Sequence, residues 1–539
     1  MAIGVPSESP AIIVKEVDLT GGVPNVQSTT GAYAGEFRWG PAEVATKIST
    51  ETELATTFGA PDDNRAVDFH TAAYFLKYSN ALQVVRAIDG DSAANAAAGL
   101  AGQDSADLIK NADHRDTLTG LADWTAKYPG TLGNSLKYAV LNNGSWATDA
   151  ASFKAQFDGL PDAGEVHVLV LDEDGVITGT SNSVLERYSF LSTSASATNA
   201  DGSTNYAKDV INARSNWLWY NGASFADAKD SASLAFGHDG TISTGDYTTA
   251  YNQVEDKDTI EVDFLIAPGM TTASAQETVV DDLVATASST RKDCVVVTSP
   301  ASASVVNASD PVTATVADVD DYTYSSYLVV DNNWLKVYDK YNDKYIHIPA
   351  SSSTAGIMAA SDANAAPWFS PAGPRRGNYL GVTNLAYTPT KAQRDTLYKA
   401  GINPIANMPG QGVLLFGDKT HMNRPSAFDR INVRRLFLVL ERSIALAARN
   451  TMFEFNDEFT RAEFVSIVEP FLREVKGRRG ITDFRVVCDE TNNTAAVIDR
   501  NEFIANIFIK PARSINYITL NFVAVRTGVD FEEVAGLQV

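Results

Sequence analysis

Two short apolar segments near the middle of the chain constrain the fold more than any other sequence feature. Residues 262–266 read VDFLI and are followed by Pro268-Gly269, and residues 293–298 read DCVVVT. Short apolar runs that are rich in β-branched residues and bounded by turn residues are typical of buried β-strands. Helical segments lie between them, so the region from about residue 180 to 350 is predicted to be α/β.

The length of the chain requires several folded units. It has 539 residues, whereas a single hydrophobic core stops growing at roughly 250–300 residues. We therefore expect three or four compact units. Hydrophobic residues make up 44% of the chain, which excludes wholesale disorder.

Neither a disulfide framework nor a membrane segment is expected. The sequence contains two cysteines, Cys294 and Cys488, which are too few for a disulfide scaffold. The first ten residues, MAIGVPSESP, lack the basic and apolar regions of a secretory signal. No run of about 18 apolar residues is present, so we expect no membrane span and no membrane insertion.

Charge is distributed unevenly along the chain. The net charge is −23, yet residues 372–539 hold 22 Lys and Arg against 18 Asp and Glu. An acidic protein repels phosphate, so a dedicated nucleic-acid binder is not expected. The C-terminal cations are clustered as Arg434 with Arg435, and as Arg473, Lys476, Arg478 and Arg479. They form either a solvated helical face balanced by local glutamates or a docking surface for an acidic partner.

The C-terminal third has the clearest periodicity. Apolar residues at helical spacing predict helices over residues 431–448 and 457–476, the second with Asn456 as N-cap. Pro470 is expected to bend or split that second helix. Strands are predicted at residues 484–488, 503–509 and 515–525, and another at residues 11–17 in an N-terminal arm.

Other segments are predicted to be loops or exposed strands. Residues 91–123 are rich in Ala, Asp, Gly and Ser, which indicates an insertion or a loose loop. Residues 299–321 and 350–366 are predicted to be Ser/Ala/Asp-rich loops. Residues 322–345 carry six tyrosines and one tryptophan, which indicates strands or a hairpin on an exposed face.

A search for chemical motifs finds no convincing site. The histidines are too far apart for a zinc motif. Residues 410–420 resemble a P-loop, but Asp418 stands between Gly417 and Lys419 and the apolar residues 413–416 form a strand where the loop should be. The acidic clusters at 172–174, 318–321 and 489–490 lack the EF-hand register, and calcium binding by them is left open. We expect no enzymatic activity and no cofactor.

A series of motifs, in order along the chain, resembles the contractile tail sheath family of phages and related injection machines. The N-terminal half contributes SPAIIVKEVDLTGG, FRWGP, TFG, YPGTLGNSLKY and FLIAPG, at residues 9–22, 37–41, 57–59, 128–138 and 264–269. The C-terminal part contributes NMPGQGVLLFGDKT, RINVRRLFLVLERSI, FEFNDEFTRAEF, FRVVCDETNNTAAVIDRNEF and IFIKPARSINYITLNF, at residues 407–420, 430–444, 453–464, 484–503 and 507–522. The resemblance covers both ends strongly and the centre in patches.

The resemblance implies a multidomain α/β (mixed α+β) fold. In the family, N- and C-terminal segments together build an inner α/β domain, and middle domains project outward. The expected divisions are an N-terminal arm (1–20), a first part of the core (21–90), a small insertion (91–127), outward-facing middle α/β domain or domains (128–350), a loop or linker (351–371), a C-terminal inner domain (372–513) and a C-terminal strand or arm (514–539).

The function that the resemblance implies is mechanical. Subunits would polymerise as a helical homopolymer of six-fold rings around a tail tube, in a metastable extended state whose contraction drives the tube through a host envelope. The other partners would be baseplate and tail-terminator or neck proteins. The protein would be assembled in the host cytoplasm and reside in the virion.

Two groups of residues are candidates for these contacts. Subunits would exchange strands through apolar terminal residues, namely Ile12, Ile13, Val14, Val17, Ile515, Tyr517, Ile518, Leu520 and Phe522. A basic patch would face the tube, formed by Arg473, Lys476, Arg478 and Arg479. The alternatives are a surface-layer or other self-assembling structural protein and, from another class, a hydrolase that uses the acidic clusters.

Overall fold

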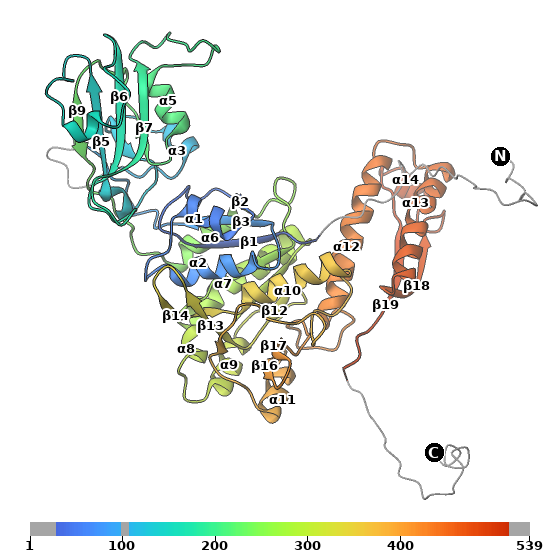
Figure 1. The fold of residues 1–539 in the computed structure, drawn as a ribbon. Coiled ribbons are helices and arrows are strands. Elements are labelled where there is room, and N and C mark those ends of the chain that lie inside the picture. The colour runs from blue at the N-terminus through green and yellow to red at the C-terminus, as the bar shows by residue number, and fades with distance from the viewer. Residues whose placement is uncertain (1–27, 99–106, 517–539) are drawn as a thin grey trace, which may run out of the picture.

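The computed structural model describes residues 28–98 and 107–516 and divides them into three lobes (Figure 1). We call them the central lobe, the antiparallel lobe built around residues 124–239, and the C-terminal lobe built from residue 431 onward. The central lobe lies between the other two (Figure 1). Among the described residues, no helix combines the length and apolarity needed to cross a membrane.

The central lobe is organised by a six-stranded sheet in the order β12-β11-β10-β1-β3-β2. Neighbouring strands are parallel except β2, which is antiparallel to β3. The strands are β1 (Gly31–Glu36), β2 (Thr46–Ile48), β3 (Leu82–Ala87), β10 (Phe264–Ile266), β11 (Val295–Thr298) and β12 (Leu328–Val330). The two predicted buried strands at 262–266 and 293–298 are confirmed, because β10 and β11 are buried along their whole length.

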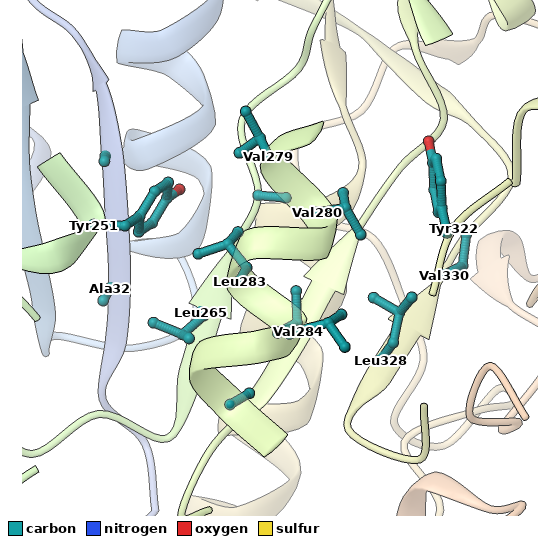
Figure 2. Close-up of a cluster of buried hydrophobic side chains, with 14 of the residues drawn as sticks. Ala32, Tyr251, Leu265, Val279, Val280, Leu283, Val284, Tyr322, Leu328 and Val330 are labelled. Carbon is teal, nitrogen blue, oxygen red and sulfur yellow. The ribbon is translucent and has the colours of Figure 1, made fainter. Parts of the chain in front are cut away.

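Helices cover both faces of this sheet, which explains why its strands are apolar throughout. Successive strand residues point to opposite faces, so Leu265 packs with one set of helices while Phe264 and Ile266 pack with the other. Figure 2 shows the first face, where Val280, Leu283 and other side chains of α7 meet Leu265. The covering helices are α6 (Thr244–Asn252), α7 (Ala273–Ala285) and α9 (Pro311–Asp320) on that face, and α2 (Ala66–Phe75) and α10 (Ser351–Asn364) on the other.

The loop predicted at residues 350–366, and with it the linker proposed at 351–371, is wrong over most of its length. Residues Ser351–Asn364 form helix α10, and ten of its residues are buried. Small residues allow this helix to pack closely: a Cβ on Gly356 would lie 2.5 Å from Cδ2 of Tyr78. The predicted loop at 299–321 is also wrong, because it contains α8 (Ser302–Val305) and α9.

The remaining elements of the central lobe flank the sheet. They are α1 (Glu51–Phe58), the π-helical turn η2 (Thr286–Arg291), β13 (Trp334–Asp339), β14 (Lys344–Pro349), β15 (Asn384–Leu385), α11 (Lys391–Lys399), β16 (Ile405–Met408) and β17 (Gly412–Leu415). Strands β13 and β14 pair as an antiparallel hairpin on which Tyr338 and Tyr345 are exposed. The predicted tyrosine-rich hairpin is therefore confirmed.

The antiparallel lobe is built on a four-stranded sheet in the order β7-β6-β5-β9. Its elements are α3 (Ala112–Thr117), β4 (Trp124–Ala126), η1 (Thr131–Ser135), β5 (Leu136–Asn142), α4 (Ala151–Lys154), β6 (Glu165–Asp172), β7 (Ser183–Ser192), α5 (Ala207–Arg214), β8 (Leu218–Tyr220) and β9 (Asp230–Ser233). The segment 128–350 therefore contributes to two separate sheets. Residues 93–98, predicted within an insertion or loose loop, are buried, and Asn95 bonds the backbone of Ile109 and Ala126.

The C-terminal lobe follows the predicted pattern closely. It consists of α12 (Ile431–Ala448), η3 (Arg449–Thr451), α13 (Glu458–Gly477), β18 (Ile481–Val487), α14 (Ala495–Ile498) and β19 (Asn506–Pro511). The N-cap of α13 is Asp457 rather than Asn456, because the Asp457 side chain accepts a hydrogen bond from the Thr460 amide. Pro470 does not split α13: it is exposed, so water can reach the Ser466 carbonyl that loses its helical donor.

Candidate assembly interface

The C-terminal lobe presents a small sheet with unpaired edges. Strands β18 and β19 pair antiparallel from Ile481 opposite Pro511 to Val487 opposite Asn506. Within the described residues this sheet has two strands, so each strand has one edge whose backbone N–H and C=O groups find no ladder partner there. Such an edge is a template for pairing with another strand.

Helix α13 holds this sheet in place through its apolar stripe. Phe464, Val468 and Leu472 are buried, and the side chains of Ile507 and Ile509 on β19 pack against the same cluster. The alternate residues of β19 point away from the helix, and Phe508 is 59% exposed. One face of the sheet is therefore fixed to α13, while the other face and both edges remain accessible among the described residues.

Most of the residues predicted to exchange strands lie outside the described residues. These are Ile12, Ile13, Val14, Val17, Tyr517, Ile518, Leu520 and Phe522. Ile515 is described: it is 80% exposed and lies four residues beyond the end of β19. The C-terminal segment therefore leaves the lobe directly after one strand of the open-edged sheet.

The predicted basic patch lies at the C-terminal end of α13, where three of its four cations have a nearby carboxylate. Arg473 lies 3.5 Å from Glu469, Lys476 lies 3.2 Å from Asp483, and Arg478 lies 3.7 Å from Glu474. The Lys476 ammonium holds the pKa of the Asp483 carboxyl below its usual range.

Arg478 and Arg479, the last two residues of this patch along the chain, differ in their surroundings. The Arg478 guanidinium also covers the ring of Trp368 and donates to the Ala365 carbonyl. Arg479 is exposed, and no carboxylate of the described residues lies within 4.0 Å of it. The local glutamates support the interpretation of a solvated helical face for Arg473 and Arg478, whereas Arg479 is available for an external anion.

The other predicted cation cluster faces the interior. Arg434 is 7% exposed and stacks on Tyr327 and Phe428, and Arg435 is 4% exposed. Neither predicted alternative, a solvated helical face or a docking surface, holds for these two arginines, because both are buried and point from α12 into the central lobe. A pair of adjacent arginines in a sequence does not reveal which helix face each one occupies.

Buried ion pairs attach α12 to the central sheet. Arg435 pairs with Asp362 of α10 and also donates to the Met358 carbonyl at 3.1 Å. Arg442 pairs with Asp263, which directly precedes β10, at 2.6 Å. Burial raises the pKa of Asp362 to about 6 and also raises the pKa of Asp263, although the nearby arginines oppose both shifts. The C-terminal lobe is therefore firmly connected to the sheet.

The glycine-rich motif at 410–420 is a structural turn. Strands β16 and β17 form a hairpin through Gly410 and Gly412, both at positive φ. Asp418 is buried and binds Arg430 at 3.0 Å and the Ser514 hydroxyl at 2.7 Å. The carboxylate that disrupts the P-loop pattern therefore joins the C-terminal segment to the central lobe.

The acidic clusters also have structural partners. Asp172 accepts hydrogen bonds from the backbone of Gly175, Ile177 and Thr178, and so closes a loop after β6. Asp318 accepts from the Ala301 amide and the Tyr322 hydroxyl. Within residues 28–98 and 107–516, no group of three His, Cys, Asp or Glu side chains is placed to hold a metal ion.

An open cavity of about 970 Å³ separates α11 and β17 from the end of α13, and the sequence did not reveal it. Trp368, Phe369 and Phe416 contribute apolar surface, and cations from four different segments also line it. These segments are distant in sequence, so only the fold brings them together. In the sequence, nothing about the individual residues except their type pointed to this cavity.

Two models of known protein families match this chain. The phage tail sheath protein central domain matches residues 240–421, and the phage tail sheath C-terminal domain matches residues 423–524. The tail sheath protein of Vibrio phage KVP40 is 30% identical over 98% of this chain and 99% of its own length. The tail sheath protein of Enterobacteria phage T4 is 30% identical with the same coverage, and that of Salmonella phage ViI is 31% identical over 94% of both chains.

Solved structures share the fold at lower sequence identity. A sheath tail protein from Listeria innocua has a TM-score of 0.56 at 15% identity, over 91% of this chain and 96% of that chain. The sheath complex of an extracellular contractile injection system in its contracted state has a TM-score of 0.52 at 13% identity, over 98% of this chain and all of that chain. At these identities the likeness concerns the fold alone.

Proposed function

This chain belongs to the phage tail sheath protein family, and from that premise we propose that it is the structural subunit of a contractile tail sheath, polymerised helically around a tail tube. Its role is mechanical: an extended assembly shortens and drives the tube through a host envelope. No catalytic step is needed, because the free energy is stored in the assembly.

The observation that carries this proposal is the open-edged β18–β19 sheet. It offers two edges, and the chain has two strand-like terminal segments, at residues 11–17 and 515–525. We assign one terminal strand to each edge. The two strands come from two different neighbouring subunits. Strand addition supplies directional main-chain hydrogen bonds without requiring rigid contact between the subunit bodies.

Such links suit a polymer that changes its packing. A heterologous contact that does not close on itself generates a helix. Flexible strand links keep neighbours connected while the packed faces of the lobes move between two discrete arrangements. A modest free-energy difference per subunit between these two arrangements is then multiplied by the number of subunits in the assembly.

The remaining partners follow from the same role. The subunits form six-fold rings, the lowest ring meets a baseplate, and the uppermost ring meets a tail-terminator or neck protein. The protein assembles in the host cytoplasm and remains in the virion. The basic patch at the end of α13 contacts the tube.

The strand-exchange proposal is tested by removing the terminal strands. Chains that lack residues 1–20 or 514–539 should remain folded by circular dichroism but should form no cylinders in electron micrographs. Ile518→Pro should have the same effect, because proline removes a ladder donor, while Ile518→Val is the matched control and should assemble. Normal cylinders from both truncated chains would reject strand exchange.

The tube contact is tested by charge reversal. The double change of Arg478 and Arg479 to Glu should prevent assembly on tubes, but Arg478 also contacts Trp368. Arg479→Glu alone is therefore the sharper variant, and Lys257→Glu, at an exposed site of the central lobe outside the patch, is the matched control. A docking effect weakens with salt, since the Debye length falls to about 3 Å at 1 M. Equal assembly by Arg479→Glu at low salt would rule out the docking role.

A further inference from the structure

The turn between α12 and α13 carries an exposed group of large apolar side chains. Phe453 is 101% exposed, Phe455 is 83% exposed and Phe459 is 76% exposed, and Met452 beside them is 59% exposed. Three acidic residues, Glu454, Asp457 and Glu458, lie among them and are also exposed. We call residues 452–459 the knob.

The knob is held in a defined position. The Asn456 side chain donates to the Glu502 carbonyl at 2.8 Å and to Asn493 at 3.2 Å, and it accepts from Arg461 at 2.9 Å. Asp457 caps α13. Because the polar residues of the turn bind the lobe, its aromatic residues are directed away from it. Exposed aromatic groups that are fixed in this way are typical of interaction sites.

The cavity at the other end of α13 has the opposite charge and a similar apolar character. Apart from the basic patch proposed to face the tube, four of the cations that line it have no carboxylate within 4.0 Å among the described residues: Arg376, Lys391, Arg394 and Arg513. Its carboxylates are Asp395 and Asp418, and Asp418 already binds Arg430. Trp368, Phe369, Phe416 and Ile515 add apolar surface. We call this cavity the socket.

Helix α13 separates the two features. The knob ends at Phe459 in its first turn, and Lys476, Arg479 and Ile481 of the socket lie at its other end. A helix of 20 residues is about 30 Å long, so the knob cannot enter the socket of its own chain. A knob that fills a socket must come from another copy.

We propose that the acidic aromatic knob of one subunit inserts into the basic aromatic socket of a neighbouring copy. The proposal rests on the proposed function, because it takes the chain to polymerise with its own copies. Knob and socket are different surfaces of one chain, so the contact is heterologous and repeats from copy to copy. Each aromatic side chain contributes roughly 150–250 Å² of contact surface, and the carboxylates beside it meet the unpaired cations.

Cross-linking tests the pairing directly. The native thiols, Cys294 and Cys488, are buried, so cysteines introduced by Phe455→Cys and Lys391→Cys are the accessible ones. A chain with both changes should give a ladder of covalent oligomers with a short bis-maleimide, in the assembled protein and in the concentrated soluble chain. Two chains with one change each should give dimers only when mixed. The matched control combines Phe455→Cys with Tyr345→Cys on β14 and should give no ladder.

A second variant measures the contribution of the knob without cysteines. The double change Phe453→Ser and Phe455→Ser should weaken self-association by about tenfold or more, as expected for central aromatic contacts. Tyr345→Ser, at a site 57% exposed on another lobe, is the matched control and should leave it unchanged. Sedimentation velocity of the full-length chains measures self-association of the double variant and of the control. An unchanged melting temperature shows that each variant folds.

The outcomes separate this inference from the proposed function. Cylinders without a Phe455–Lys391 ladder would overturn the inference and leave the sheath role intact. A link from Phe531→Cys, rather than from Phe455→Cys, to the socket would also overturn it, because the acidic segment 530–533 would be the occupant. If the unaltered chain forms no polymer, the proposed function fails, and the ladder in the soluble chain still decides the inference.

Discussion

Replacing Arg435 by Met should release α12 from the central lobe at a large energetic cost. Arg435 binds Asp362 with two nitrogens and donates to the carbonyls of Met358 and Ser28. The side chains of Arg435 and Asp362 are 4% and 3% exposed, so the change would leave a carboxylate buried without its partner. Breaking a buried pair in this way costs about 3–5 kcal/mol, or roughly a hundredfold to several thousandfold in the folding equilibrium.

A double variant shows whether the cost comes from the uncompensated charge. Arg435→Met with Asp362→Leu replaces the pair by apolar groups, and such replacements are often neutral or stabilising. We expect its free energy of unfolding to lie within about 1 kcal/mol of that of the unaltered chain. Urea titrations followed by circular dichroism measure all the variants. A loss below about 1 kcal/mol for Arg435→Met, or a double variant less stable than the single one, would refute this reasoning.

Three further changes probe the core, and a fourth, at the exposed Arg473, probes the surface. Burial raises the pKa of Asp331 to about 7, against about 3.9 in an unfolded chain. The native state therefore retains a proton that the unfolded state has lost, and stability falls by about 4 kcal/mol as pH rises from 4 to 7. Asp331→Asn should remove this dependence in urea titrations at pH 5 and 8. By the same assay, Leu472→Ala should lower the free energy of unfolding by about 2–5 kcal/mol. Arg473→Ala should lower it by less than about 0.5 kcal/mol. Gly356→Ala should lower the melting temperature, because its Cβ would lie 2.5 Å from Tyr78 and overpacking costs about 1–3 kcal/mol.

The sequence predicted α12 and α13 well because large apolar residues recur at helical spacing along both helices. Leu436 and Leu440 on α12, and Val468 and Leu472 on α13, recur at helical spacing and face the same cluster. Helix α10 has no such stripe: it is surrounded by the sheet and by α2, so small residues occupy nearly every position. A buried helix of Ser and Ala has the composition of a loop, and periodicity cannot distinguish the two.

The architecture of the sheet was not predictable from local patterns. Strand β1 lies between β3 and β10, so residues near 31 pair with residues near 82 and near 264. Strand signals report burial and length but do not name the partner strand. The candidate interface shows the same limit: the sequence marked the FEFNDEF segment as a family motif and a helix start, but not as an exposed surface. That exposure depends on how Asn456 is held by Asn493 and Glu502.

Strand exchange and the knob–socket contact would place different demands on a contracting polymer. Main-chain pairing at the edges of β18 and β19 is nearly independent of side-chain identity, and it keeps neighbours connected whatever their relative orientation. A fixed knob in a shaped socket instead sets the distance and angle between two lobes, because its aromatic side chains tolerate little displacement. A polymer with two packings needs one contact that persists and one that differs between the states. Since the knob and the socket carry opposite charges, salt should weaken that contact before it weakens the strand pairing, and the two can be separated by ionic strength alone.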